Sequence, residues 1–140
     1  MTENFKIISS FIKDMSSETP NAQTFIFARD RISKYRLNID ITSKALKDGV
    51  IEVNTILKFT DQPEILKKSH FEITYASIVK VDEKVSDKKE MEKIILCDVP
   101  NKIYPDLERI FLNLLTDSGY PGIKFEKKVN FMELYKQKSN

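Results

Sequence analysis

Few side chains in this chain could act as nucleophiles or metal ligands. It has one histidine, His70, and one cysteine, Cys97, and neither lies in a recognisable motif. A catalytic nucleophile needs a base beside it, and a metal site needs several ligands at regular spacing. The 3 glycines are also too few for a phosphate-binding loop. We therefore predict a protein that is not an enzyme and that binds no cofactor and no metal.

His70 and Cys97 both have a plainer interpretation. His70 falls on the polar side of an alternating strand, so we expect it to face solvent. Cys97 ends the apolar run 94–97 and is expected to be a small buried residue. A single cysteine excludes an internal disulfide and favours a reducing compartment, so we expect a cytoplasmic protein.

The C-terminal part of the chain is rich in lysine. Its basic residues are Lys124, Lys127, Lys128, Lys136 and Lys138. They could contact phosphates, but no nucleic-acid-binding motif accompanies them, and solubility explains them equally well. The whole chain carries 23 basic and 21 acidic residues, a net charge of +2. We predict no nucleic-acid partner.

Length and composition indicate one soluble domain over residues 1–140. A chain of 16.3 kDa buries roughly two-thirds of its unfolded surface and has no room for a second core. No apolar run approaches the roughly 20 residues of a membrane-spanning helix, so we predict no membrane insertion. Residues 1–4 lack the basic and apolar regions of a signal peptide, which again favours the cytoplasm.

The stretch 99–122 predicts the long helix around which the chain is organised. Pro105 fits the first helical turn, and Gly119 followed by Pro121 ends the helix. Apolar side chains recur between these signals at helical spacing: Leu107, Ile110, Phe111, Leu114 and Leu115. Such a stripe must be buried, either entirely on the chain's own sheet or partly across a two-fold axis between copies.

Three segments alternate between apolar and polar residues and predict the strands of that sheet. They are residues 35–42, 51–59 and 71–81, separated by turn signals at Asp48-Gly49 and at 61–63. Short turns make neighbouring strands antiparallel. Residues 5–15 alternate less regularly and predict a first strand. We expect Phe5, Ile7, Phe11 and Met15 to lie on the same face of this strand.

The remaining segments connect and close this core. Residues 16–27 begin with turn formers and are predicted to be an irregular connection, in which Phe25 and Phe27 either pin the loop down or bind a partner. Residues 82–93 mix both charges and predict a solvated loop or a short helix. Asn130 and Glu133 form a capping box that predicts a short terminal helix.

Four motifs of this sequence occur in an order and spacing that resemble one known family. They are residues 11–22, residues 71–76, the run Val99-Pro100-Asn101-Lys102-Ile103-Tyr104-Pro105, and residues 129–135. Together they resemble the SecB export chaperones over essentially the whole chain. The resemblance implies an α+β fold: a four-stranded antiparallel sheet with a crossover first strand, one long helix and a short C-terminal helix.

The resemblance also implies a function. SecB proteins are cytosolic ATP-independent holdases that form a homotetramer, a dimer of dimers, bind unfolded preproteins and deliver them to the SecA motor. This chain departs from the family in being slightly basic, in ending without an acidic tail, and in having Val99 in place of a cysteine and His70 in place of an apolar residue. An alternative is therefore a divergent SecB-like chaperone, or a binding module for a specific partner such as a toxin–antitoxin pair.

Two sets of site residues follow. Aromatic and aliphatic side chains suit a client recognised only by being unfolded, and we predict substrate-binding grooves lined by Phe25, Phe27, Ile103, Tyr104, Phe131, Leu134 and Tyr135. The resemblance also implies an acidic patch of Asp14, Glu18 and Glu72 that docks SecA, although these three are equally well explained as ordinary surface carboxylates.

Overall fold

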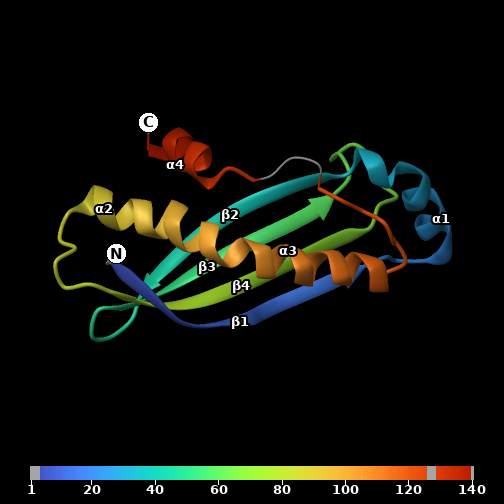
Figure 1. The fold of residues 1–140 in the computed structure, drawn as a ribbon. Helices are drawn as coiled ribbons and strands as arrows, with labels where there is room; N and C mark the ends of the chain where they lie inside the picture. The colour runs from blue at the N-terminus through green and yellow to red at the C-terminus, as the bar shows by residue number, and fades with distance from the viewer. Residues whose placement is uncertain (1–3, 126–128, 140) are drawn as a thin grey trace.

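The computed structural model describes residues 4–125 and 129–139, which form an antiparallel sheet with one long helical run across one face (Figure 1). The elements are β1 (Phe5–Glu18), α1 (Ala22–Arg31), η1 (Ile32–Lys34), β2 (Arg36–Ala45), β3 (Val50–Thr60), β4 (His70–Val81), α2 (Lys88–Lys93), η2 (Ile94–Asp98), α3 (Val99–Asp117) and α4 (Phe131–Ser139). In space the strands lie in the order β1-β4-β3-β2. The helix α1 and η1 carry the chain from one edge of the sheet to the other. The predicted four-stranded fold with a crossover first strand is confirmed.

Local turn chemistry sets the register of β2 against β3. Asp48 and Gly49 have positive φ angles of 61° and 73°, and the N–H of Val50 donates to the carbonyl of Lys47 at 3.2 Å. Positive φ at both central residues is the type I′ geometry that matches the twist of a hairpin. The pairing then runs without a shift from Ala45↔Ile51 to Arg36↔Thr60.

The core lies between α3 and the sheet face that α3 covers, here called the inner face. Leu107, Phe111 and Leu115 are fully buried, and they meet odd-numbered strand residues such as Phe71 and Ile73. Ile110 and Leu114, also part of the predicted stripe, are only half-buried. The stripe therefore packs on the sheet as predicted, with one flank left partly accessible.

The long helix begins earlier than the sequence predicts. From Lys88 onward the chain is helical through α2, the π-helical turn η2 and α3, which form one run across the sheet (Figure 1). Pro105 thus lies inside α3 instead of in its first turn, and that prediction was wrong. The proline removes one helical hydrogen bond, to the carbonyl of Asn101, but Asn101 is exposed and water can reach it.

The predicted end of the long helix is confirmed. Gly119 has a φ of 103°, the left-handed conformation that favours glycine after a helix. Its N–H donates to the carbonyl of Thr116 at 3.1 Å, and the N–H of Tyr120 donates to that of Leu115 at 2.9 Å. This pair of hydrogen bonds is a Schellman motif. A side chain at Gly119 would lie 2.5 Å from the ring of Phe25, so this glycine also lets α1 approach.

The strand β1 is longer and less regular than predicted. It extends to Glu18 and shifts register against β4 between Ile7 and Ser9 and again between Ile12 and Asp14. A bulge moves the following residues to the opposite face. Phe11 therefore pairs with Ala76 on the outer face, whereas Met15 pairs with Ile73 on the inner face. The prediction that Phe11 and Met15 share a side with Phe5 and Ile7 was wrong for Phe11.

Residues 22–31 form a helix, α1, where the sequence predicts an irregular connection. Asn21 caps it, because its side chain accepts a hydrogen bond from the N–H of Thr24 at 2.8 Å. The spacing of the apolar residues does not predict this helix, because its buried side is made of small residues. Its buried residues are Thr24 and Ala28, while the large side chains of Ile26 and Phe27 are 53% and 41% exposed.

The terminal helix α4 begins at the predicted cap. The side chain of Asn130 accepts a hydrogen bond from the N–H of Glu133 at 3.1 Å. The ring of Phe131 packs against Tyr104 at 5.5 Å between centroids and ties α4 to α3. No helix in residues 4–125 and 129–139 is long and apolar enough to cross a membrane.

Candidate functional site

A groove of about 1120 Å³ runs beside the edge strand β2. One wall is the start of β2 with the turn before it, and the other is the segment that follows α3. The lining residues are Ile32, Ser33, Tyr35, Arg36, Leu37, Asn38, Ile39, Phe59, Pro121, Gly122, Ile123, Lys124, Phe125 and Val129. We call this cavity the β2 groove.

Aromatic rings form the floor of the β2 groove. Phe59 lies 5.5 Å from Tyr35 and 5.7 Å from Phe125, measured between ring centroids. Phe125 in turn stacks on Phe111 of α3 at 6.2 Å. The segment after α3 is therefore held over the sheet by ring contacts, and the groove has an apolar base continuous with the core.

The backbone of β2 offers hydrogen-bonding groups along its free edge. The N–H of Leu46 donates to the carbonyl of Val50 at 2.8 Å. This hydrogen-bonded pair shows which residues of β2 direct their backbone groups to β3. Hydrogen-bonded pairs alternate along an antiparallel ladder, so Arg36 and Asn38 point their N–H and C=O groups to β3. Leu37 and Ile39, which line the groove, point theirs away from the sheet. No other described residue bonds to these groups.

The seven predicted substrate-binding residues fall into two separate groups. Phe25 and Phe27 lie on α1, at the end of the sheet where β1 finishes (Figure 1). Phe25 is half-buried against Tyr120 at 5.2 Å, and Phe27 is exposed with the guanidinium of Arg31 over its ring at 5.9 Å. The other five, Ile103, Tyr104, Phe131, Leu134 and Tyr135, lie where α4 meets the N-terminal part of α3.

Within the second group, three residues are buried in this chain. Ile103, Tyr104 and Phe131 are 5%, 9% and 2% exposed. The hydroxyl of Tyr104 has no hydrogen-bond partner among the described residues, and burial, followed by the nearby Glu108 carboxylate, raises the pKa of Tyr104 far above 10. Leu134 and Tyr135 are half-buried, and the hydroxyl of Tyr135 donates to the carbonyl of Lys89 at 3.5 Å.

An ion pair fixes α1 to the loop between β3 and β4. Arg31 donates to both carboxylate oxygens of Asp61, at 2.7 and 3.0 Å. The Asp61 side chain is fully buried, and the hydrogen bond from Arg31 holds the pKa of its carboxyl below the usual range. This contact fixes the end of α1, which carries Phe27, and the turn at Ile32 and Ser33 that lines the β2 groove.

The predicted partner-binding residues share the outer face, opposite to α3. Asp14 pairs with Thr74 and Glu18 with His70, while Glu72 lies between them on β4. His70 is 3.1 Å from Glu72, through Nε2 and Oε1, and Lys58 stands directly across from Glu72 on β3. The structure thus gathers the three carboxylates on one face, but it mixes them with the ammonium of Lys58 and the ring of His70.

The edge strand β1 exposes a group of large apolar side chains. Ile8, Phe11, Ile12 and Met15 are between 42% and 55% exposed. Ile12 and Met15 lie on the inner face, next to the half-buried flank of α3, because they pair with Tyr75 and Ile73. We call these four residues the β1 apolar group.

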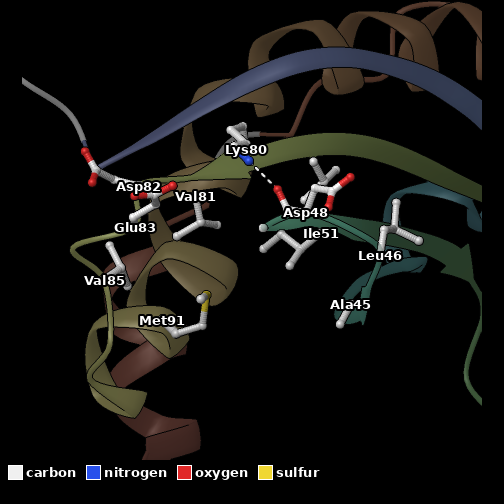
Figure 2. A pocket seen from close by; sticks show the side chains of 12 residues that line it. Ala45, Leu46, Asp48, Ile51, Lys80, Val81, Asp82, Glu83, Val85 and Met91 are labelled. Atoms are coloured by element: carbon white, nitrogen blue, oxygen red, sulfur yellow. Dashed lines mark hydrogen bonds between the residues drawn. The ribbon is translucent and has the colours of Figure 1, made fainter.

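A second, smaller cavity of about 440 Å³ lies at the hairpin end of the sheet (Figure 2). Its floor is apolar, from Leu46 and Ile51 on the hairpin and from Val85 and Met91 beside it. Figure 2 shows Asp82 and Glu83 above this floor on one side and the hairpin turn at Asp48 on the other. Nothing in the sequence predicts this cavity, since its walls come from segments up to 46 residues apart, Ala45 to Met91.

The sequence also does not predict the β2 groove. Leu37 and Ile39 read as core positions of an alternating strand, and the structure shows that they line an accessible wall. Ile123 and Phe125 belong to a segment with no regular pattern, so only the fold brings them beside β2. Lys127 and Lys128 of the basic C-terminal part lie outside the described residues. No group of described His, Cys, Asp and Glu side chains could hold a metal ion.

Comparison with known proteins identifies the family. The sequence matches the family of the preprotein translocase subunit SecB over residues 1–140. It is 84% identical over 140 residues to a putative protein-export protein SecB of Pelagibacter ubique, with all of both chains covered. The chain belongs to the SecB family. It is also 24% identical over 135 residues to the protein-export protein SecB of Parvibaculum lavamentivorans, covering 95% of this chain and 77% of that protein.

A solved SecB-like structure shares the fold. It is a SecB-like chaperone of Mycobacterium tuberculosis, solved in complex with a ChAD peptide from an antitoxin. Its TM-score is 0.64 at 11% identity, covering 89% of this chain and 91% of that one. SecB membership supports a chaperone role in protein export for this chain, and SecB chaperones are not enzymes.

Proposed function

We propose that this SecB protein is an ATP-independent cytosolic holdase that binds unfolded preproteins along the β2 groove. The observation that carries the proposal is the free edge of β2 beside an aromatic floor. Every unfolded chain has unpaired backbone N–H and C=O groups, and it can pair with Leu37 and Ile39 whatever its sequence. A folded client has already paired those groups, so this edge distinguishes the unfolded state from the native one.

The predicted substrate-binding residues have different parts in this proposal. Phe27, which is exposed at the α1 end, extends the apolar contact beyond the groove, and half-buried Phe25 supports it. Leu134 and Tyr135 are reachable on α4. The buried residues Ile103, Tyr104 and Phe131 act by holding α4 in place.

A refolding assay tests the holdase proposal. The purified protein is expected to slow the refolding of a model preprotein and to suppress its aggregation without ATP. The variant Phe125→Ala, which removes a ring from the groove floor, should weaken both effects. Met132→Ala, at a 37% exposed apolar residue on α4, is the matched control. A wild-type protein with neither effect would end the proposal.

We also propose that the protein is a homotetramer arranged as a dimer of dimers. The β1 apolar group is large for the surface of a monomer, and two of its members, Ile12 and Met15, adjoin the half-buried flank of α3. A self-complementary contact across a two-fold axis would cover both. Several grooves on one particle then raise the avidity for a long client. Light scattering that gives a monomer mass at micromolar concentration would contradict this.

Delivery to SecA is proposed through Asp14, Glu18 and Glu72 on the outer face. Complementary charge speeds a transient encounter without tight affinity, and such binding weakens with salt. His70 and Lys58 lie beside Glu72, and Glu18 pairs with His70 across the two strands, so substitutions at Glu18 and Glu72 alter the same part of the patch. The double variant Glu18→Lys with Glu72→Lys is expected to lose SecA binding at low salt. Equal binding by wild type and variant would exclude the patch.

A second candidate function is binding to one dedicated partner protein. The observation that favours it is the Mycobacterium tuberculosis neighbour, whose bound peptide comes from an antitoxin. On this alternative, the β2 groove of the present protein binds one peptide from a toxin–antitoxin pair or another specific partner. A pull-down from cells of the source organism discriminates the two. Many unfolded precursors support the holdase, and a single native protein supports the alternative.

A further inference from the structure

A cluster of hydroxyl groups is buried at the end of the sheet nearest α1 (Figure 1). Its centre is Ser69, which is fully buried immediately before β4. The N–H of Ser69 donates to the hydroxyl of Tyr35 at 2.9 Å, and its carbonyl accepts from the hydroxyl of Thr60 at 3.2 Å. The hydroxyl of Ser69 is hydrogen-bonded to those of Thr19 at 2.7 Å and Tyr120 at 3.0 Å. Ser69 therefore uses all of its polar atoms to join separate segments of the chain.

Two of these partners belong to opposite walls of the β2 groove. Tyr35 lines the groove and packs on Phe59 of its floor, with 5.5 Å between the ring centroids. Tyr120 directly precedes Pro121, the first residue of the wall that follows α3. Ser69 does not line the groove, yet it is hydrogen-bonded to both sides. We call the path from Tyr35 through Ser69 to Tyr120 the Ser69 bridge.

Packing alone fixes the wall after α3 less completely than this bridge does. The ring of Tyr120 contacts Phe25 at 5.2 Å and Phe71 at 5.5 Å, measured between centroids. Apolar contacts are not directional, whereas a hydrogen bond between hydroxyls requires a narrow range of distance and angle. Tyr120 is 3% exposed, so bulk water has little access to its hydroxyl. The Ser69 bridge is therefore the contact that sets the distance between the two walls.

We propose that Ser69 is a positioning residue for client binding, which holds the two walls of the β2 groove at a fixed separation. The proposal rests on the function proposed above and names what keeps the groove formed before a client arrives. A groove that is already formed loses less conformational freedom when an extended chain enters it, and so it binds that chain more tightly. Breaking the Ser69 bridge should weaken client binding although no residue that lines the groove is changed at the break.

Ser69→Ala and Tyr120→Phe each break the bridge at the same hydrogen bond. The client is a fluorescent model preprotein whose cysteines are alkylated so that it stays unfolded, and anisotropy titrations give its dissociation constant. Each variant is expected to raise that constant about fivefold, the effect of losing one buried hydrogen bond. Since both changes remove the same bond, the double variant should bind no more weakly than either single variant.

Thermal unfolding separates positioning from stability. Ser69→Ala leaves the buried hydroxyl of Tyr120 without its partner and should lower the Tm. The double variant replaces both partners by apolar groups and should regain part of that loss, but client binding should not recover with it. Tyr120→Phe leaves Ser69 hydrogen-bonded to Thr19, so this variant tests the bridge even if Ser69→Ala does not fold.

A matched control is a second buried hydroxyl on β4. Ser77 is 1% exposed, and its hydroxyl is hydrogen-bonded to that of Ser10 at 3.0 Å, which joins β4 to β1 and not the groove walls. Ser77→Ala should lower the Tm and leave the dissociation constant unchanged. A fluorinated phenylalanine in place of Phe125, which is half-buried in the wall after α3, reports on that wall directly. Its fluorine NMR resonance should shift in Ser69→Ala and Tyr120→Phe but not in Ser77→Ala.

The outcomes distinguish this proposal from the one it rests on. If the wild-type protein does not bind the alkylated preprotein, the holdase proposal itself fails. If Ser69→Ala and Tyr120→Phe bind it as tightly as wild type, or if Ser77→Ala binds it as weakly as they do, Ser69 does not position the groove and the β2 groove stands. A double variant that binds as tightly as wild type also overturns the proposal, because the unpaired Tyr120 hydroxyl then explains the weaker binding. So does a fluorine resonance that stays unchanged in both single variants.

Discussion

The sheet ends in two edge strands that differ in almost every respect. β1 has 14 residues, two shifts of register and four large apolar side chains at least 42% exposed. β2 has 10 residues, an unbroken register, and polar or charged side chains at its exposed positions from Arg36 to Lys44. Its apolar contribution, from Leu37 and Ile39, is recessed into a groove.

This difference suits two kinds of partner. A protein cannot keep the β1 apolar group in water without risking aggregation, so β1 fits permanent cover by another copy. A polar strand above a recessed apolar floor can stay uncovered and still bind an extended chain for a limited time. We infer that one sheet serves assembly at one edge and client binding at the other.

The largest expected effect comes from truncating a core side chain on which both edge strands depend. Phe111 of α3 is fully buried, and its ring lies 6.5 Å from Phe59 and 6.2 Å from Phe125 in the groove floor. Phe111→Ala is expected to lower the free energy of unfolding by about 4 kcal/mol and to impair both edges together. Urea denaturation followed by circular dichroism measures it. A loss of client binding with normal stability and assembly would show that Phe111 serves the groove alone.

Next in size is an effect on β1 only. Ile8→Lys with Ile12→Lys places two charges in the β1 apolar group, and the dissociation constant of the oligomer is expected to rise about 100-fold, or about 2.7 kcal/mol. Analytical ultracentrifugation gives the constant. Thr42→Lys, at an exposed residue of β2, is the control and should leave the mass unchanged. An unchanged mass in the double variant would mean that β1 is not an interface.

The corresponding change at β2 is made on the client. Methyl groups on alternate backbone nitrogens of a bound peptide block hydrogen bonds on one of its two edges. One set of methyl groups should weaken binding about tenfold, because it removes the pairing with Leu37 and Ile39, and the set shifted by one residue should have little effect. Equal losses for both sets would show that the groove binds side chains without adding a strand.

Much of the fold could be predicted from the sequence, because it depends on local signals. The alternation in 35–81 gives β2, β3 and β4, and Gly119 and Asn130 mark a helix end and a helix start. The failures have local causes too. Two bulges in β1 break the period of two, and the small buried residues of α1 conceal its helical face.

The candidate site was predicted less well, because it depends on long-range contacts. Sequence reasoning chose aromatic and aliphatic residues by type, and three of them are core residues in the structure: Ile103 and Tyr104 of α3 and Phe131 of α4. The groove comes instead from Leu37, Ile39 and Phe125, whose accessibility depends on strand order and on the path after α3. No local pattern contains that information, whereas the outer-face position of Glu72 follows from alternation alone.

The smallest effect concerns the support that joins the two edges, the ion pair between Arg31 and Asp61 at the end of the crossover. Because the pKa of Asp61 is lowered in the folded protein, its contribution to stability is present above the carboxyl's unfolded pKa of about 3.9 and is lost as the pH falls through the lower folded value. The difference in Tm between wild type and Asp61→Asn is therefore expected to be constant above about pH 5 and to close below about pH 4. Arg31 stays partly accessible to water, so the difference should be modest. Asp30→Asn, an exposed carboxylate on the same helix, is the control and should give no such pH-dependent difference.

Client binding at neutral pH should fall in Asp61→Asn while the oligomeric mass stays constant, because the pair orients α1 and the start of β2 but does not touch β1. A change in mass would mean that the two edges are coupled through the crossover.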